Sequence, residues 1–172
     1  ARARLESLIQ QAVEHEIVTR ARNLLMSLAW NCTALARPTA SITLHLARSL
    51  PTAGVDKRGR IFLNADFCGA LSSDELTFVL AHEILHVLFQ HFGRQGDREH
   101  QRWNRATDRA INHTLQLMKL KATKCALFPL PGTPENASAE ELYDLEPEDN
   151  GGGGESGPLP TAGCGVIDGD GA

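Results

Sequence analysis

Residues 72–92, SSDELTFVLAHEILHVLFQHF, form the most apolar long stretch of the chain and also carry a metal-ligand pattern. That pattern is His-Glu-x-x-His, with histidines at His82 and His86 and the glutamate at Glu83. Residues four apart lie on one face of an α-helix, so the two imidazoles can bind a single cation. Glu83 can then reach a water molecule held by that cation. The spacing therefore indicates the chemistry of zinc hydrolases, in which the metal polarises water and a glutamate takes its proton.

The surrounding residues predict that this stretch is a helix buried on most of its sides. Ser72 and Glu75 match a capping box, and Asp74 adds negative charge in the first turn, where the helix dipole favours it. Apolar residues recur at helical spacing, namely Leu76, Val79, Leu80, Ile84, Val87 and Leu88. Polar side chains in a buried helix need partners, which a metal ion would provide. The alternative is that ordinary hydrogen bonds satisfy these histidines and the glutamate.

The composition is that of one soluble globular domain. The chain has 172 residues, of which 42% are hydrophobic and 22% charged, with a net charge of -4. This charge predicts neither nucleic acid nor an anionic membrane as a partner. The apolar runs are shorter than the roughly 20 residues that cross a bilayer, and no leader segment is evident, so we expect a cytoplasmic protein. The widely spaced cysteines indicate neither a thiolate zinc knuckle nor a redox pair.

The flanking segments predict an α+β fold with a small, mostly antiparallel sheet. Residues 4–32 have apolar side chains at spacings of three and four, which is typical of a long amphipathic helix. Pro38 should separate this helix from a half-buried strand at residues 41–47, where apolar and polar residues alternate. Residues 54–59 have turn composition, and residues 60–64 form a second strand candidate. The metal-motif helix would follow this sheet.

A second helix, from about residue 97 or 99 to residue 119, provides a candidate third ligand. Two histidines make only part of a catalytic zinc site. Positions 89 and 92 both hold phenylalanine, which excludes the extended His-Glu-x-x-His-x-x-Gly-x-x-His pattern. Asp108 lies 22 residues after His86, with Asn104 and Asn112 four residues to either side on the same helical face. We expect Asp108 to bind the metal and the two amides to orient it.

Two motifs in this region resemble a known family. They are S-x-x-E-L-x-F-V-L-A-H-E before the first histidine and W-N-x-A-x-D-x-x-I-N around Asp108. With them, residues 40–145 resemble the putative metallopeptidase domain of bacteria and phages, which is often joined to a von Willebrand factor A-like domain. The resemblance implies a zincin-like fold, one zinc ion at His82, His86 and Asp108, and Glu83 as catalytic base. It also implies that such a downstream domain could be a partner, and it names no substrate.

The predicted function is therefore zinc-dependent hydrolysis of peptide bonds in a peptide or protein substrate. Zinc with three protein ligands keeps a position for water, and Glu83 would move that water's proton. An additional donor to the oxyanion could be His113, Arg109 or Tyr143, and the sequence does not choose among them. The alternative function is a metal-stabilised adaptor or binding module within a larger assembly.

The C-terminal residues differ in composition from the rest. We expect residues 1–146 to form the metallopeptidase domain and residues 147–172, which include GGGGESGPLP, to be a Gly/Pro-rich flexible tail or linker. Cys164 lies in this tail. A thiolate is a strong zinc ligand, so Cys164 could hold the enzyme latent by taking the position of the catalytic water.

Overall fold

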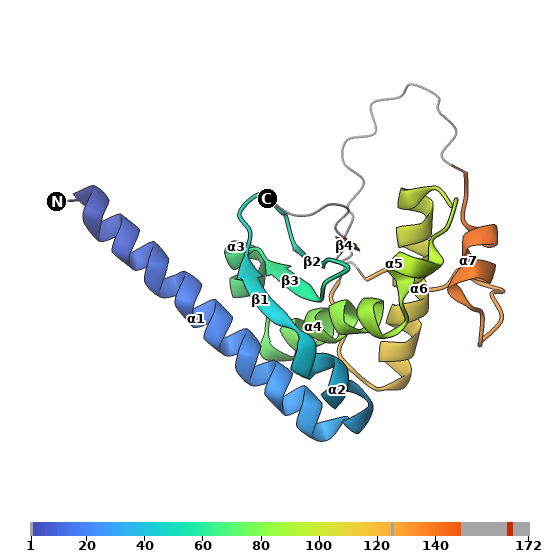
Figure 1. The fold of residues 1–172 in the computed structure, drawn as a ribbon, viewed down its shortest axis with the longest axis horizontal. Coiled ribbons are helices and arrows are strands. Elements are labelled where there is room, and N and C mark those ends of the chain that lie inside the picture. Colours follow the sequence, from blue (N-terminus) through green and yellow to red (C-terminus); the bar gives the residue numbers. More distant parts are fainter. Residues whose placement is uncertain (1, 125, 149–164, 167–172) are drawn as a thin grey trace.

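The computed structural model describes residues 2–124 and 126–148 and the backbone of residues 165–166. Its helices are α1 (Arg2–Asn31), α2 (Thr33–Ser41), α3 (Ala65–Ala70), α4 (Ser73–Leu88), α5 (His91–Arg94), α6 (His100–Leu117) and α7 (Ala139–Leu145). Its strands are β1 (Thr43–Leu46), β2 (Ala53–Val55), β3 (Arg60–Leu63) and β4 (Gly165–Val166). The fold is α+β, with more helix than strand (Figure 1).

The strands form one mixed sheet in the order β1-β3-β2-β4. Only β2 and β3 are antiparallel, whereas β1 pairs with β3, and β2 with β4, in parallel. The expectation of a mostly antiparallel sheet is therefore wrong. Ile61 and Leu63 of β3 are fully buried, which suits the central position. The chain reverses direction between β1 and β2 and again between β2 and β3, so β1 and β3 run in the same direction. Because β3 lies between β1 and β2 in the sheet, it pairs with β1 in parallel.

A short hairpin joins β2 and β3 at the residues whose composition predicts a turn. The Asp56 carboxylate accepts hydrogen bonds from the backbone N–H groups of Arg58 and Arg60, both at 2.9 Å, and Gly59 has a φ of 76°. That φ is open to glycine at little steric cost. The sequence pattern missed β2 itself, because a strand of three residues is too short to show alternation.

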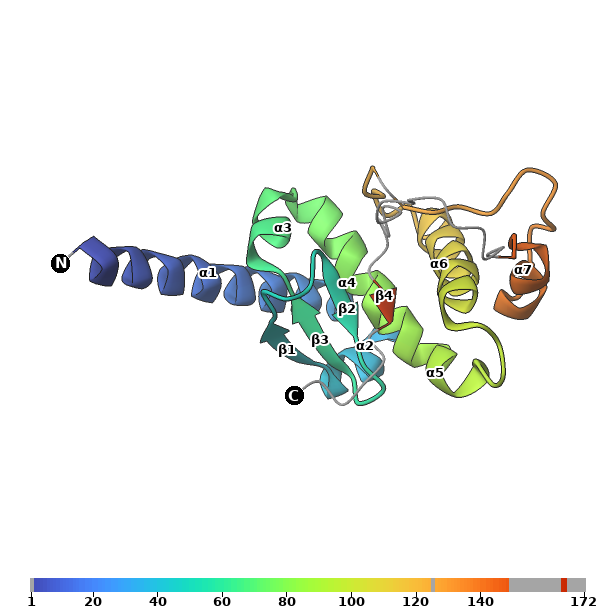
Figure 2. The same cartoon turned by 90° about the horizontal axis from the view of Figure 1, so that it is seen from above.

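The helix α4 begins and runs as its sequence predicts. The Glu75 N–H donates to Ser72 Oγ at 3.3 Å, and the Ser72 N–H donates to Glu75 Oε2 at 3.0 Å, so the capping box is confirmed. The helix packs against β2, α1, α2 and α6. In Figure 2, α4 runs between the sheet and α6. This central position explains why so many of its side chains are buried.

At the N-terminus the long helix is confirmed as α1, but the segment after it differs from the prediction. The buried side of α1 is formed by Ile17, Ala21, Leu25 and Leu28, and the first turns of the helix project beyond the rest of the molecule (Figure 1). Pro38 lies inside α2 instead of separating a helix from a strand. The fully buried Leu35 anchors α2 to the core, and this packing outweighs the hydrogen bond that a proline cannot donate.

On the other side of α4, the segment around α7 fixes α6 in place. The Glu146 carboxylate is buried and forms ion pairs with Arg105, at 3.3 Å, and with Arg109. The centroids of the Trp103 and Tyr143 rings lie 6.2 Å apart between the two helices.

Within the part of the chain that the structure describes, no helix is long and apolar enough to cross a membrane. The domain boundary near residue 147 stays a prediction.

Candidate metal centre

The crossing of α4 and α6 brings together one ligand atom from each of His82, His86 and Asp108. The two histidine Nε2 atoms lie 3.0 Å apart, and Asp108 Oδ1 lies 3.3 Å from Nε2 of His82 and 3.2 Å from Nε2 of His86. Ligand atoms of a tetrahedral zinc ion, each 2.0–2.1 Å from the metal, lie about 3.3 Å from one another. The triangle formed by the three atoms therefore has the dimensions of one face of such a site.

Local sequence explains each position in this triangle. His82 and His86 lie one helical turn apart on α4. Asp108 lies near the middle of α6, on the side that contacts α4. The exposed fractions of the three residues are 2%, 0% and 5%. Burial removes water as a partner for these polar atoms, so they must satisfy one another or bind an ion.

The side chain of Asn112 determines which nitrogen of His82 faces the cluster. Its Nδ2 donates to the carbonyl oxygen of Leu127 at 2.8 Å, so its Oδ1 is turned toward Nδ1 of His82, 2.7 Å away. A carbonyl oxygen only accepts, so His82 Nδ1 must carry a hydrogen. The lone pair of neutral His82 then lies on Nε2 and points at Asp108 and His86. This arrangement fits a cation at the centre of the triangle.

Without a metal, the charges of the cluster favour a proton in its place. Burial disfavours the charged form of His82, but Asp108, Glu83 and Asn112 together raise its pKa to about 9. Burial also raises the pKa of Asp108, yet the two histidines outweigh it and hold that pKa below its usual value. The pKa of His86 is lowered, first by burial and then by the charge on His82. One proton on His82 therefore balances the Asp108 carboxylate.

Glu83 is completely buried next to the first histidine on α4. Burial lowers the pKa of His82, and Asp108 outweighs it; the negative charge of Glu83 raises this pKa further, so the two side chains interact electrostatically. A carboxylate beside a metal site can accept a proton from water held there.

Three of the other residues singled out in the sequence, Asn104, Arg109 and Tyr143, are held by contacts outside the cluster. Asn104 Nδ2 lies 3.0 Å from His100 Nε2. Arg109 binds Glu146 and the carbonyl of Phe128, and the Tyr143 hydroxyl accepts a hydrogen bond from the Glu99 N–H at 3.1 Å. Nε2 of His113 is buried and makes no hydrogen bond to a described residue. Cys164 lies outside the described residues.

Sequence reasoning missed one residue beside the cluster. Nδ1 of His91 lies 3.2 Å from Nδ1 of His86, and His91 is only 1% exposed. The pKa of His91 is lowered to about 2, chiefly because its ring is buried, so this ring is neutral. Its only sequence signal is its place one position before the third histidine that the extended His-Glu-x-x-His-x-x-Gly-x-x-His pattern would require.

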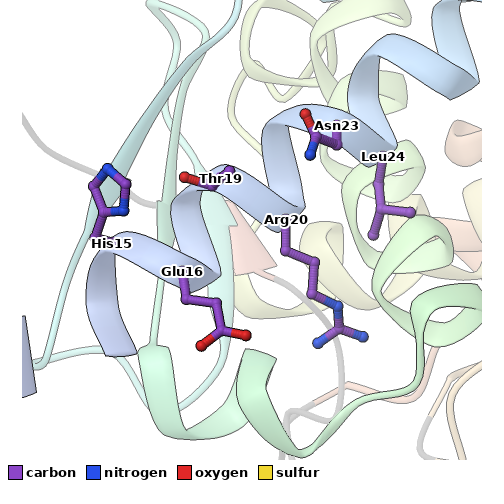
Figure 3. Close-up of a pocket in the computed structure, with 6 residues that line it drawn as sticks. All are labelled: His15, Glu16, Thr19, Arg20, Asn23 and Leu24. Atoms are coloured by element: carbon purple, nitrogen blue, oxygen red, sulfur yellow. The ribbon is translucent and has the colours of Figure 1, made fainter. Parts of the chain in front are cut away.

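A separate surface hollow lies along α1, and no residue of the metal cluster lines it (Figure 3). Its lining residues are His15, Glu16, Thr19, Arg20, Asn23 and Leu24. Among them, Arg20 donates to the carbonyl oxygens of Cys68 and Leu71 at 3.3 and 2.7 Å. These bonds tie α1 to the segment before α4, which is a structural role.

A family model described as a putative metallopeptidase domain matches residues 10–159. The matched range contains α4, α6 and all three side chains of the cluster. No curated protein and no solved structure matches the chain.

Proposed function

The chain belongs to this putative metallopeptidase domain family, and we propose that it is a zinc-dependent peptidase with a zincin-like fold. The observation that carries the proposal is the convergence of His82 Nε2, His86 Nε2 and Asp108 Oδ1 beside the buried Glu83. Two imidazoles and one carboxylate suit zinc, and three protein ligands leave a position for water. A structural zinc site would use four protein ligands and would need no adjacent base.

The mechanism assigns one task to each side chain. Zinc, when bound, supplies a Lewis acid and lowers the pKa of a coordinated water from 15.7 to about 7. His82, His86 and Asp108 would hold the ion. Glu83 accepts a proton from the attacking water and returns it to the leaving nitrogen of the peptide. Burial of Glu83 keeps bulk water from competing for that proton.

The pairing of β2 with an extended segment supports a peptide as the substrate class. Residues 165–166, as β4, pair in parallel with β2, with Gly54 opposite Gly165 and Val55 opposite Val166. The strand β4 also contacts α6, which carries Asp108, and β2 contacts α4. An extended main chain therefore fits at this edge, between the sheet and the helix with the third ligand. A substrate peptide would use the same backbone hydrogen-bonding groups.

A specific observation favours a second function. All four side chains of the centre are at least 95% buried, as their exposed fractions of 2%, 0%, 0% and 5% show. A metal in so closed a site could stabilise an adaptor domain without reacting with a substrate. Under this second function, zinc raises the stability of the domain and no peptide is cleaved.

The experiment compares wild-type protein with Glu83→Gln on an unbiased peptide mixture, with zinc content measured in both. Glutamine keeps the shape of glutamate but cannot act as a base, so we expect zinc and fold to be retained and hydrolysis to fall by several orders of magnitude. Glu16→Gln, on α1, is the matched control and should behave as wild type. Equal cleavage by wild type and Glu83→Gln would contradict the base assignment. Zinc binding without cleavage by wild type would favour the adaptor function.

A further inference from the structure

We propose that His91 is the positioning residue for the metal ligand His86. The evidence begins with the contact between their Nδ1 atoms, which are 3.2 Å apart with both rings buried. The inference rests on the proposed function, because it concerns the metal centre described above. It adds a residue that holds one ligand in the orientation that binding requires.

The direction of this hydrogen bond follows from the geometry of the centre. Nε2 of His86 faces Asp108 and His82, so in the metal-bound state its lone pair lies on that side. The hydrogen of the His86 ring is then on Nδ1, and it points at Nδ1 of His91. His91 must therefore accept, with its own hydrogen on Nε2. In most protein sites this acceptor is a carboxylate, a backbone carbonyl or a water.

An imidazole acceptor has an electrostatic consequence that a carboxylate would not have. The centre already contains two carboxylates, Asp108 and Glu83, whose charges balance one divalent cation. A further buried carboxylate behind His86 would leave an uncompensated negative charge in a low dielectric. A neutral His91 fixes the ring of His86 without adding that charge. Histidine at this position is thus suited to a buried centre.

The backbone and ring of His91 are held from a second side. Nε1 of Trp103, on α6, donates to the His91 carbonyl oxygen at 3.0 Å. The ring of His91 meets the rings of His86 and Trp103 edge-on, at centroid distances of 5.3 and 6.1 Å. Trp103 is itself 1% exposed. The same helix that provides Asp108 therefore also fixes the residue that orients His86.

The chain adopts a sparsely populated backbone conformation just before His91. Gln90 has φ 55° and ψ 38°, in the left-handed region that residues other than glycine rarely occupy. Its carbonyl oxygen accepts from the Gly93 and Arg94 N–H groups at 3.0 and 3.1 Å, which holds the turn. This turn ends α4 and directs the ring of His91 back onto His86. Conformations of this kind are retained where the surroundings require them, most often at functional sites.

The test uses two substitutions at position 91 and measures zinc affinity by competition with a chromophoric chelator. His91→Leu keeps the volume but removes the acceptor, and we expect it to weaken zinc binding by about 10- to 100-fold. His91→Asn places Oδ1 near the position of Nδ1, so it should restore affinity close to that of wild type. His15→Leu, an exposed residue of α1, is the matched control and should bind zinc as wild type does.

Two further measurements separate positioning from a general role in folding. Thermal unfolding of the metal-free His91→Leu variant should stay cooperative, with a midpoint only modestly below that of metal-free wild type, because one buried hydrogen bond is lost while an apolar side chain is gained. In zinc-loaded wild type labelled with ¹⁵N-histidine, a scalar coupling across the hydrogen bond should join the two Nδ1 atoms.

Wild-type zinc affinity in a folded His91→Leu variant, or absence of the nitrogen-to-nitrogen coupling in loaded wild type, would overturn the inference and leave the peptidase proposal standing. Failure of wild type itself to bind zinc would overturn both. Loss of zinc affinity in the asparagine variant as large as in the leucine variant would also count against positioning by an acceptor.

Discussion

Asn112 Nδ2 donates a hydrogen bond of 2.8 Å to the backbone carbonyl of Leu127. This bond fixes the orientation of an amide that could otherwise present either its oxygen or its nitrogen to His82. It thereby links the loop after α6 to the protonation of a candidate metal ligand on α4. His82 and His86 are thus each held at Nδ1, by Asn112 and by His91, with both Nε2 atoms facing Asp108.

Replacing Asn112 tests the first of these two links. Asn112→Ala removes the acceptor for His82 Nδ1, so we expect zinc affinity to fall by about 10- to 100-fold. It also removes the donor to Leu127, so the free energy of unfolding of the metal-free protein, measured in urea, should be about 1 kcal/mol lower. Asn23→Ala, on α1, is the control and should change neither quantity. Unchanged zinc affinity in a folded Asn112→Ala protein would contradict the assignment of the His82 tautomer.

The assignment of the third ligand can be checked by elemental analysis. Asp108→Ala should reduce zinc occupancy at limiting zinc more severely than Asn112→Ala, because it removes a ligand and not only its support. Asp97→Ala, an exposed aspartate before α6, should keep full occupancy. If Asp108→Ala retained zinc and a His91 or His100 variant lost it, the third ligand would be that histidine and not Asp108.

The raised pKa of His82 predicts how the stability of the metal-free protein depends on pH. The folded value of about 9 exceeds the ordinary value of 6.5, so the stabilisation that this group provides is complete below pH 6.5 and is lost as the pH rises to about 9. The pKa values of His86 and His91 are lowered, so protonation of these two rings reduces stability only below pH 6.5, outside this window. Urea unfolding should therefore show decreasing stability from pH 7 to 9.

Bound zinc should remove the dependence of stability on pH between pH 7 and 9, because it replaces the proton on His82. Binding at pH 7 should release about one proton, measurable by calorimetry in buffers of different ionisation enthalpy. The control for the stability profile is metal-free Asp108→Asn, which lacks the charge that raises the His82 pKa and should lose the decrease between pH 7 and 9. A flat stability profile between pH 7 and 9 in metal-free wild type would show that His82 is neutral there.

The pairing of β4 with β2 predicts that the C-terminal residues affect activity. A truncation after residue 150 removes β4 and frees the β2 edge for a peptide, so we expect its rate of peptide hydrolysis to exceed that of the longer chain. Cys164→Ser distinguishes the cause. Latency through a thiolate on zinc raises activity in both variants, whereas occupation of the edge by β4 raises it only in the truncation. Equal rates in all three proteins would exclude both forms of inhibition.

The sequence by itself determined those features that depend on neighbours along the chain. The capping box of Ser72 and Glu75, the helical spacing of His82 and His86, and the extents of α1 and α6 follow from side chains within one or two turns. The same local spacing singled out Asp108 between two amides. Which of those amides would contact the cluster could not be seen, because it depends on how α6 crosses α4.

Only the tertiary structure decided the features that depend on packing between distant segments. The central position of β3, and with it the parallel pairing of β1, follows from burial of Ile61 and Leu63 beneath the helices. The continuation of α2 through Pro38 follows from the buried side chain of Leu35. The contact of His91 with His86 requires the left-handed turn at Gln90 and the hydrogen bond from Trp103. Each depends on long-range contacts, whose free energy outweighs local preference and leaves no periodic pattern in the sequence.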